Sequence, residues 1–355
     1  MPWITDMLKS DYVIVGSGLT GATIAKFLHA AGREVIVIEK RKRVGGNVSD
    51  EIHPSGFRYN LYGPHYFRTN NVQLWEYAQR FGEFFQFEAV VKTMVDGEIH
   101  NWPITEEMIG NFSPPKLESD GSFETEHLLR FPEEIYRKFI KSYTEKQWGI
   151  PASKLEAPLR RKLEIRTNGD NRLSTKKYQG IPLRGYTAWV DAMLEGICVF
   201  TDMDYTEHRE NIVANKSLIF TGPIDAYFDY THGKLPSRSQ RRENFLCNSE
   251  RVLPTCQLNY PSPTLEFIRL IEWKHIWRND SRKSLLTSET PIDGGDEYPF
   301  PSKYAAAMYS KYRAMADSLD GVRIEGRCGR YVYLDMDQSI SHGISVAKDI
   351  IKDGG

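Results

Sequence analysis

Cysteine is scarce in this chain, and long apolar runs are absent. Its four cysteines, Cys198, Cys247, Cys256 and Cys328, show neither CxxC spacing nor the pattern of a disulfide framework. No stretch approaches the roughly 18 consecutive apolar residues of a membrane span, and the first ten residues resemble neither a secretory signal nor an anchor. We therefore expect a protein of the reducing cytoplasm that makes no membrane contact.

An excess of charge of one sign is also lacking. Lys and Arg number 46 against 47 Asp and Glu, which leaves a formal net charge of −1. Such a chain has no global field to attract a polyanion, so we expect no nucleic-acid partner. The length of 355 residues exceeds what one compact core usually holds, so we expect two or three domains, some built from discontinuous segments.

The clearest pattern is a glycine-rich turn between an expected strand and an expected helix. The apolar run 12–15 precedes Gly16, Gly18 and Gly21 in GxGxxG spacing, and a second apolar run at 34–39 completes a βαβ unit. In this geometry Gly16 permits the tight turn, Gly18 lets backbone approach a pyrophosphate, and Gly21 lets helix and strand pack closely. The unit predicts dinucleotide binding.

An acidic residue ends the second expected strand. Glu39 stands where a carboxylate can accept hydrogen bonds from an adenosine ribose. It is followed by Lys40 and further basic residues, then by Gly45, Gly46 and Asn47, a segment that flavoproteins often use to bring backbone against FAD. The alternative interpretation is that residues 40–43 form a solvated basic turn.

Beyond this unit, residues 71–177 have a helical pattern, and strand patterns return at 197–200, 217–223, 244–303 and 322–327, before a helix that begins near 335. Segments spread along nearly the whole chain resemble the UDP-galactopyranose mutases. They are 13–21, 39–47, Tyr-Gly-Pro-His at 62–65, YTEKQWG at 143–149, 178–182, TGPIDAYFDY at 221–230, 269–272, 326–327 and 333–336. The YTEKQWG and TGPIDxYFDY segments are specific to that family.

The resemblance implies an α/β fold in three parts. These are an FAD-binding Rossmann-like domain (1–70, 190–240 and 318–355), an inserted, mainly helical substrate domain (71–189, with a mobile loop near 160–177) and an antiparallel sheet domain (241–317). It also implies an enzyme, an isomerase that interconverts the pyranose and furanose forms of a nucleotide-diphosphate sugar. FAD must be reduced, because its N5 forms a covalent adduct with the anomeric carbon while the diphosphate leaves and returns. No metal is implied, and a homodimer is expected.

Site residues follow from the same resemblance. His65, Arg269 and Tyr333 match catalytic positions, with His65 next to the flavin and the other two at the diphosphate. Expected cofactor contacts are Gly16, Gly18, Gly21, Glu39, Lys40, Gly46, Asn47, Arg327, Asp335 and Met336. Expected substrate contacts are Tyr143, Trp148, Lys162, Arg172, Arg269, Tyr298 and Tyr333. Each also has a structural interpretation, such as a turn histidine, core aromatics or a helix-capping acid.

Departures from the family pattern cluster around the substrate. Arg68 replaces a second histidine, and Lys162 stands in the position of a mobile-loop arginine, with Arg160 and Arg161 adjacent. The hydroxyl of a family tyrosine is lost at Leu173, where neighbouring Arg172 is its expected replacement. Another family tyrosine is either shifted to Tyr298 or lost at Phe300.

Three alternatives therefore stay open. The first is a mutase for a GDP- or dTDP-linked (deoxy)hexopyranose in natural-product or glycan biosynthesis. The second is an FAD-dependent oxidoreductase of the amine-oxidase type, which would share the Rossmann-like opening. The third is a catalytically silent protein that binds nucleotide sugars.

Overall fold

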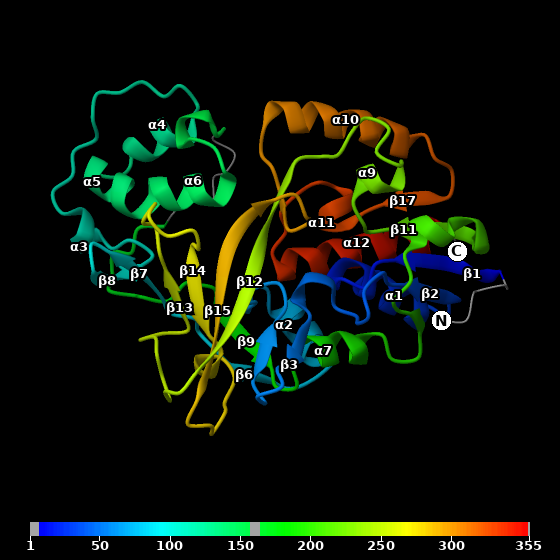
Figure 1. Cartoon of the computed structure of the whole chain (residues 1–355). Coiled ribbons are helices and arrows are strands. Elements are labelled where there is room, and N and C mark those ends of the chain that lie inside the picture. The colour runs from blue at the N-terminus through cyan, green and yellow to red at the C-terminus, as the bar shows by residue number, and fades with distance from the viewer. Residues whose placement is uncertain (1–6, 157–163, 354–355) are drawn as a thin grey trace.

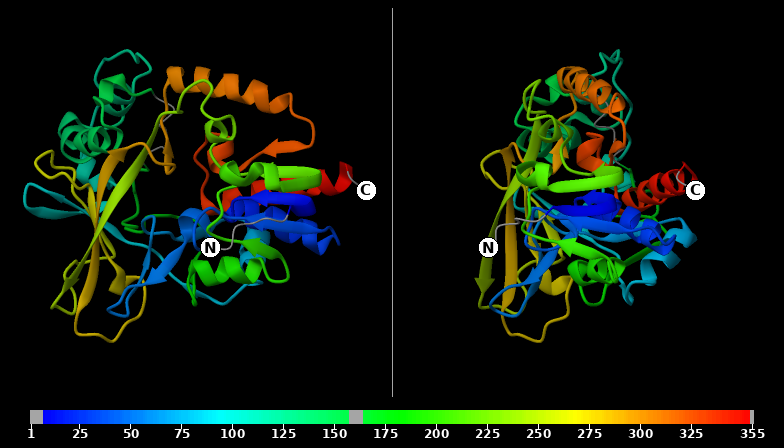
Figure 2. Two further views of the ribbon diagram at one scale, coloured as in Figure 1. Left: turned by 45° about the vertical axis from the view of Figure 1, so that its right-hand side comes forward. Right: turned by 90° about the vertical axis from the view of Figure 1, so that its right-hand side faces the viewer.

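The computed structural model describes residues 7–156 and 164–353 (Figure 1). A parallel sheet with its helices lies at one side, two long antiparallel strands in the middle, and a cluster of short helices at the other side (Figures 1 and 2). The predicted α/β fold class is confirmed.

The parallel sheet has the strand order β10-β2-β1-β11-β17. Its strands are β1 (Leu8–Val15), β2 (Val35–Ile38), β10 (Cys198–Phe200), β11 (Ile212–Phe220) and β17 (Val322–Ile324). Every residue of β2 is buried, as expected for a parallel strand that is covered on both faces. The strand–helix–strand unit predicted at the N-terminus is confirmed, because β2 pairs in parallel with β1 after the helix α1 (Leu19–Ala30).

Two helices from opposite ends of the chain cover one face of this sheet. They are α1 and α12 (Met336–Asp353), and α10 (Lys303–Asp317) covers the other face. The two helices pack closely because Gly343 of α12 has no side chain: a Cβ there would lie 2.9 Å from the Thr20 carbonyl oxygen. The N-terminus of each helix is thereby brought to the same end of the sheet.

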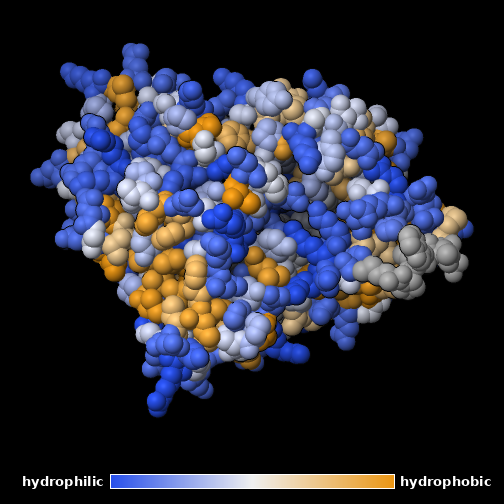
Figure 3. Space-filling model, viewed as in Figure 1, coloured by the Kyte–Doolittle hydropathy of each residue, from blue (hydrophilic) through white to orange (hydrophobic). Residues whose placement is uncertain are grey.

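The second large sheet has the order β16-β12-β15-β14-β13-β7-β8. Its strands are β7 (Val91–Val95), β8 (Glu98–Trp102), β12 (Ser237–Cys247), β13 (Gln257–Asn259), β14 (Arg269–Glu272), β15 (Ser284–Asp293) and β16 (Tyr298–Pro299). All pairs are antiparallel except β13 with β7. Leu258, Leu270 and Leu286 cluster with Leu253, and apolar residues are visible over β13–β15 in Figure 3. Alternate residues point to the opposite face of the sheet.

A helical cluster precedes the segment 157–163. It contains α3 (Glu106–Ile109), α4 (Phe123–Leu128), α5 (Glu133–Ile135), a π-helical segment (Tyr136–Lys141) and α6 (Ser142–Trp148). Its own small core contains Phe131, Tyr136 and Phe139. The cluster therefore packs around apolar residues of its own, separate from the core of the parallel sheet.

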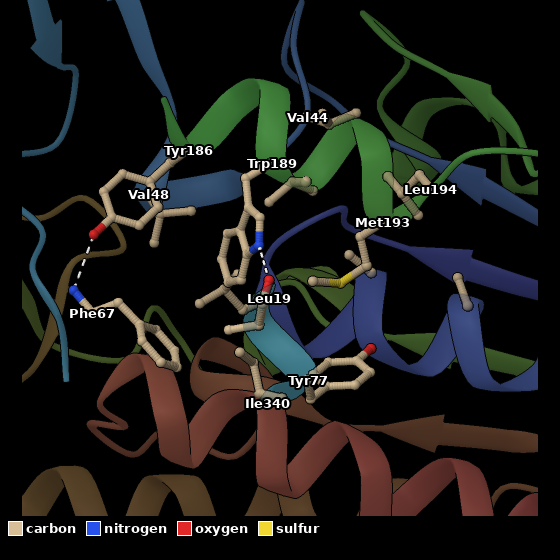
Figure 4. Packing of buried hydrophobic residues seen from close by; sticks show 14 of the residues in the cluster. Leu19, Val44, Val48, Phe67, Tyr77, Tyr186, Trp189, Met193, Leu194 and Ile340 are labelled. Carbon is tan, nitrogen blue, oxygen red and sulfur yellow. Dashed lines mark hydrogen bonds between the residues drawn. The ribbon is translucent and has the colours of Figure 1, made fainter. Parts of the chain in front are cut away.

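Smaller elements connect these parts. They are β3 (Asp50–Ile52), β4 (Arg58–Asn60), β5 (Phe67–Thr69), α2 (Val72–Gln79), β6 (Phe84–Gln86), β9 (Tyr178–Pro182), α7 (Tyr186–Met193), α8 (Tyr205–His208), α9 (Ile224–Tyr227) and α11 (Gly326–Gly329). Trp189 of α7 is buried, and its indole N–H donates to the Ala78 carbonyl at 2.8 Å (Figure 4).

The stretch 71–189 is less helical than the sequence predicts. Strands β6 to β9 also lie in it, and β7 and β8 belong to the large antiparallel sheet. In β7 the burial alternates strictly, with Val91, Thr93 and Val95 buried and the residues between them half-buried. This two-residue period is the signature of a strand, and the helical pattern of the flanking sequence obscured it.

Lys146 of α6 joins the helical cluster to the long sheet. Its ammonium group donates to four main-chain carbonyls at 2.6–3.1 Å, those of Tyr260, Ser262, Leu265 and Phe267. We expect Lys146→Met to lower the free energy of unfolding by about 3 kcal/mol, because the carbonyls lose a charged donor. Urea denaturation measures this, with Lys154→Met at an exposed position as the control. An equal, small loss in both variants would contradict the expectation.

No helix of the described residues is long and apolar enough to cross a membrane. Within 7–156 and 164–353, no group of three or more His, Cys, Asp or Glu side chains could hold a metal ion.

Candidate functional site

A cavity of about 1230 Å³ lies where the three parts of the molecule meet. Its walls come from the β1–α1 turn, the start of α12, the inner face of the antiparallel sheet and helix α6. This volume exceeds the roughly 300–1,000 Å³ of a site for one drug-sized ligand. The cavity can therefore hold a large cofactor and a substrate together.

The glycine turn forms one end of the cavity. A Cβ on Gly21 would lie 2.0 Å from the Gly16 carbonyl oxygen, so Gly21 is required for the turn itself. A Cβ on Gly18 would meet nothing within 4 Å, and Gly18 lines the cavity. Gly18 is also the N-cap residue of α1. Within the described part of the chain, no side chain accepts a capping hydrogen bond from the amides at this helix N-terminus. The turn thus offers open space and a helix N-terminus, which suits a pyrophosphate.

Glu39 is buried beside this turn. Its carboxylate accepts hydrogen bonds from the Ser17 amide at 2.9 Å, the Ser17 hydroxyl at 2.6 Å and the Arg41 amide at 2.9 Å. These donors fix its orientation, and the residue still lines the cavity. Gly46 approaches the turn closely, since a Cβ there would lie 2.9 Å from the Gly18 Cα. Asn47 accepts from the Arg41 guanidinium at 3.0 Å.

The far end of the cavity is formed by the start of α12. Asp335 and Met336 line it, and Asp335 lies 3.9 Å from the guanidinium of Arg68. Arg327 donates to the main-chain carbonyls of Asp296 and Glu297, and Lys40 pairs with the Asp296 carboxylate at 3.4 Å. All ten predicted cofactor positions line this one cavity, from the glycine turn to α12.

His65 also lines the cavity, on the turn 62–65. Its Nδ1 donates to the Gly63 carbonyl at 2.7 Å, which leaves Nε2 as an acceptor in the neutral ring. Burial lowers the pKa of His65 to about 4. The positive charges of Arg327 and Arg242 act in the same direction, and the hydrogen bond to Gly63 opposes them. The imidazole is therefore neutral at pH 7.

We expect this lowered pKa to make the apoprotein less stable in mild acid. The unfolded chain binds the proton near pH 6.5 and the folded chain only near pH 4, so stability falls as pH drops through that window. Burial lowers the pKa of His127 as well, which acts in the same direction. Urea denaturation at pH 7.5, 6 and 5 measures the slope, and ¹³C-histidine NMR, assigned with His65→Asn, measures the pKa. A His65 pKa above 6 would contradict the expectation.

A row of charged residues crosses the antiparallel sheet on the cavity side. Arg269 of β14 and Arg242 of β12 both stand directly opposite Glu289 of β15 in the strand register. The Arg269 Nε donates to one oxygen of Glu289, and the Arg242 Nε donates to the other at 2.7 Å. Glu289 is fully buried. Burial alone would raise the pKa of Glu289, but the positive charges of Arg269 and Arg242 lower it below its usual value. The Glu289 carboxylate is therefore ionised at pH 7.

This row continues to Glu297. The Arg242 Nη atoms bind both oxygens of the Glu297 carboxylate, at 2.8 and 2.7 Å. The sequence predicted Arg269 but missed Arg242, Glu289 and Glu297. They are far apart along the chain and meet only through strand register, so a local motif could not reveal them.

Aromatic side chains form the remaining wall. Tyr298 and Tyr333 stack in parallel with ring centroids 6.3 Å apart, and Trp148 meets Phe300 edge-on at 5.6 Å. Burial raises the pKa of Tyr143, and the positive charge of Arg269 opposes that rise. All five of these aromatic residues line the cavity, so the structure brings the predicted substrate aromatics together with Arg269.

One predicted substrate residue does not line the cavity, and another is not among the described residues. The Arg172 guanidinium forms ion pairs with Asp170 at 2.8 Å and with Glu88 at 2.6 Å. The neighbouring Leu173 lines the cavity, whereas Arg172 is not among the lining residues. Neighbouring carboxylates engage the Arg172 guanidinium, so the structure does not bring Arg172 together with the other predicted substrate residues, and its role as a replacement for the missing hydroxyl stays a prediction. Lys162 falls in 157–163, outside the described residues. In the described part of the predicted mobile loop, Lys176 pairs with Asp337 of α12 at 2.8 Å.

Comparisons with known proteins agree with this geometry. A family model described as UDP-galactopyranose mutase matches residues 138–333, and one described as an NAD(P)-binding Rossmann-like domain matches residues 14–81. The chain is 29% identical over 371 residues to a probable UDP-galactopyranose mutase of Klebsiella pneumoniae (97% of this chain, 96% of the relative). It is 28% identical over 369 residues to a dTDP-fucopyranose mutase of Escherichia coli (96% and 98%). The fold matches a crystal structure of reduced UDP-galactopyranose mutase with a TM-score of 0.77 at 15% identity, covering 97% of this chain and 96% of that one.

Proposed function

Because this chain belongs to the UDP-galactopyranose mutase family and is an isomerase of nucleotide sugars, we propose that it uses reduced FAD to interconvert the pyranose and furanose forms of a nucleotide-diphosphate sugar. The observation that carries this proposal is the single cavity that joins a dinucleotide-binding turn to the Arg269 side of the antiparallel sheet. We further propose that the three-part division of the chain at 1–70/190–240/318–355, 71–189 and 241–317 describes its functional domains.

The residues at both ends of the cavity fit FAD. The open space at Gly18, the uncapped start of α1 and the fixed carboxylate of Glu39 suit its pyrophosphate and ribose. The start of α12 lies at the other end, where its N-terminal dipole favours negative charge. When bound and reduced, FAD would supply the nucleophilic nitrogen for covalent catalysis at the anomeric carbon. A solved relative described as reduced supports a redox-active cofactor in this fold.

The protein's own residues would hold the sugar nucleotide in place. Arg269 and Tyr333 would bind the diphosphate both in the substrate and as the leaving group, and fixed donors are needed because the charge on the departing phosphate grows. Tyr143 and Trp148 of α6 would contact the nucleoside and sugar. Neutral His65 would face the cofactor with an unprotonated Nε2, which can accept a hydrogen bond.

A second candidate substrate is a dTDP-linked deoxyhexose. The identity to the dTDP-fucopyranose mutase, 28%, nearly equals that to the probable UDP-galactopyranose mutase, 29%. Leu173 and Phe300 put apolar side chains on the cavity wall at positions where the resembled family has tyrosine hydroxyls. Loss of one buried hydrogen-bonding partner typically costs about 1–3 kcal/mol, so these changes must be either compensated elsewhere in the site or matched to another ligand.

The test is anaerobic incubation of the FAD-loaded protein, with and without dithionite, against UDP-, dTDP- and GDP-hexopyranoses. We expect a furanose product, resolved by chromatography, only in the dithionite arm, and the preferred nucleotide identifies the substrate class. Product formation without reduction, or oxygen consumption with an amine, would overturn the proposal in favour of oxidoreductase chemistry. Binding without turnover in the dithionite arm would indicate a silent binding protein.

A further inference from the structure

We propose that Arg242, which does not line the cavity, is a positioning residue that controls how tightly the cavity holds a diphosphate. This inference rests on the proposed function, since it takes Arg269 as the diphosphate ligand. Arg242 acts from behind the cavity wall, where it neutralises two buried carboxylates that would otherwise repel the substrate.

The contacts of Arg242 use both edges of its guanidinium. Nε donates to Glu289, and the Nη pair donates to both oxygens of Glu297. The exposed fractions of the three side chains are 12%, 0% and 8%, so water screens these charges poorly. A lysine could not form this arrangement, because its ammonium group lacks the planar fork that reaches two carboxylates at once.

Glu289 is shared between two arginines, and this sharing determines what Arg269 offers to the cavity. One carboxylate oxygen binds Arg269 and the other binds Arg242. With Arg242 present, the four charges of the row balance, and Arg269 lines the cavity as part of a neutral row. Without Arg242, two buried carboxylates would face one arginine, and the excess negative charge would oppose an incoming diphosphate.

The same row supports the turn that carries His65. A Cβ on Gly63 would lie 2.4 Å from Glu289 Oε1 and 3.4 Å from Arg242 Nη2, so the turn rests directly on this ion pair. Positioning of Glu289 by Arg242 therefore reaches both sides of the reaction centre, the diphosphate side through Arg269 and the cofactor side through the turn 62–65.

The neighbouring residue on β12 provides a matched control. Arg241 points to the opposite face of the sheet, where its guanidinium is about half exposed and lies 3.8 Å from Glu243 and 3.6 Å from Glu266. Both of those carboxylates are solvent-exposed. Arg241→Met and Arg242→Met thus remove the same charge from adjacent positions, but only the second leaves buried carboxylates unpaired.

The experiment measures binding of UDP-galactose, dTDP-galactose and GDP-mannose to the oxidised, FAD-loaded protein by calorimetry, so that turnover does not interfere. For the sugar nucleotide that the unaltered protein binds best, we expect Arg242→Met to raise Kd at least about 30-fold and Arg241→Met to change it less than twofold. The double variant Arg242→Met/Glu297→Gln should bind at least about fivefold tighter than Arg242→Met, because the amide restores the charge balance. Thermal melting and FAD content report on folding.

The outcomes distinguish failure of the proposed function from failure of this inference alone. Failure of the unaltered protein to bind any of the three compounds would overturn the proposed function and this inference with it. Binding by Arg242→Met within threefold of the unaltered protein would overturn the inference alone, as would a double variant that binds no tighter than Arg242→Met. If Arg242→Met does not fold, the single variant Glu297→Gln tests the inference instead. We expect it to bind the sugar nucleotide about threefold tighter than the unaltered protein, and weaker binding than that of the unaltered protein would overturn the inference.

Discussion

Replacing Arg269 by methionine should lower kcat/KM for the sugar nucleotide by about a thousandfold. Arg269 is the arginine of the charged row that lines the cavity, and its Nε donates a hydrogen bond to Glu289. Removing one preorganised donor to developing charge typically costs a factor of about 10²–10³, and here a full positive charge is lost as well. The loss should appear in kcat as well as in kcat/KM, because the interaction strengthens as the diphosphate departs.

Arg269→Lys separates charge from geometry. Lysine keeps the positive charge but cannot bind Glu289 and a phosphate with one planar group, so we expect a loss of about 10–100-fold. Steady-state kinetics with dithionite-reduced protein measures both variants, and FAD absorbance confirms that the cofactor is retained. Activity of Arg269→Met within threefold of the unaltered protein would remove Arg269 from the diphosphate site.

Gly18→Val should weaken FAD binding at least about a hundredfold while leaving the apoprotein folded. The backbone of Gly18 (φ −63°, ψ 172°) is open to any residue, and a Cβ there meets no protein atom within 4 Å. The valine side chain would instead fill the space next to the start of α1, where a pyrophosphate needs close backbone approach. A hundredfold change in Kd corresponds to about 2.7 kcal/mol.

Gly21→Ala provides the contrast, because its Cβ would lie 2.0 Å from the Gly16 carbonyl oxygen, and both groups belong to fixed backbone. We expect this variant to lower the stability of the apoprotein by about 3 kcal/mol. Fluorescence titration with FAD and urea denaturation of the apoproteins distinguish the two variants. If Gly18→Val binds FAD as the unaltered protein does, the pyrophosphate does not occupy this turn.

The parts of the fold that the sequence predicted are those with local signals. The GxGxxG turn directly follows β1, the second apolar run forms β2, and the TGPIDAYFDY segment directly follows β11. These three strands lie in one parallel sheet. The strands β6 to β9 escaped prediction because they are three to five residues long and lie among helical patterns. A short strand gains its stability from partners that are distant in sequence, so its local pattern is weak.

The candidate site divides in the same way. Glu39 and the three glycines follow from the βαβ motif, whereas Arg242 and Glu289 depend on strand register, which the sequence does not display. Arg172 illustrates the reverse case. Its charge and its place next to Leu173 suggested a phosphate contact. In the structure, the carboxylate of Asp170, two residues away, accepts hydrogen bonds from the Arg172 guanidinium. A basic residue beside a local acid often pairs with that acid, and only the three-dimensional arrangement shows which residue reaches the cavity.

The ribosome makes α1 long before its packing partner. The helix ends at residue 30, β11 and β17 begin at residues 212 and 322, and α12 begins at residue 336. At about 5–20 residues per second, roughly 15 to 65 seconds pass between synthesis of α1 and completion of α12. During that time the apolar side chains of Ile24 and Leu28, fully buried in the finished protein, lack the cover that α12 provides. The parallel sheet therefore receives its last strand and its α12 cover late in synthesis although it begins the sequence, and a nascent chain that stalls before residue 336 presents a sheet without that cover to chaperones and proteases.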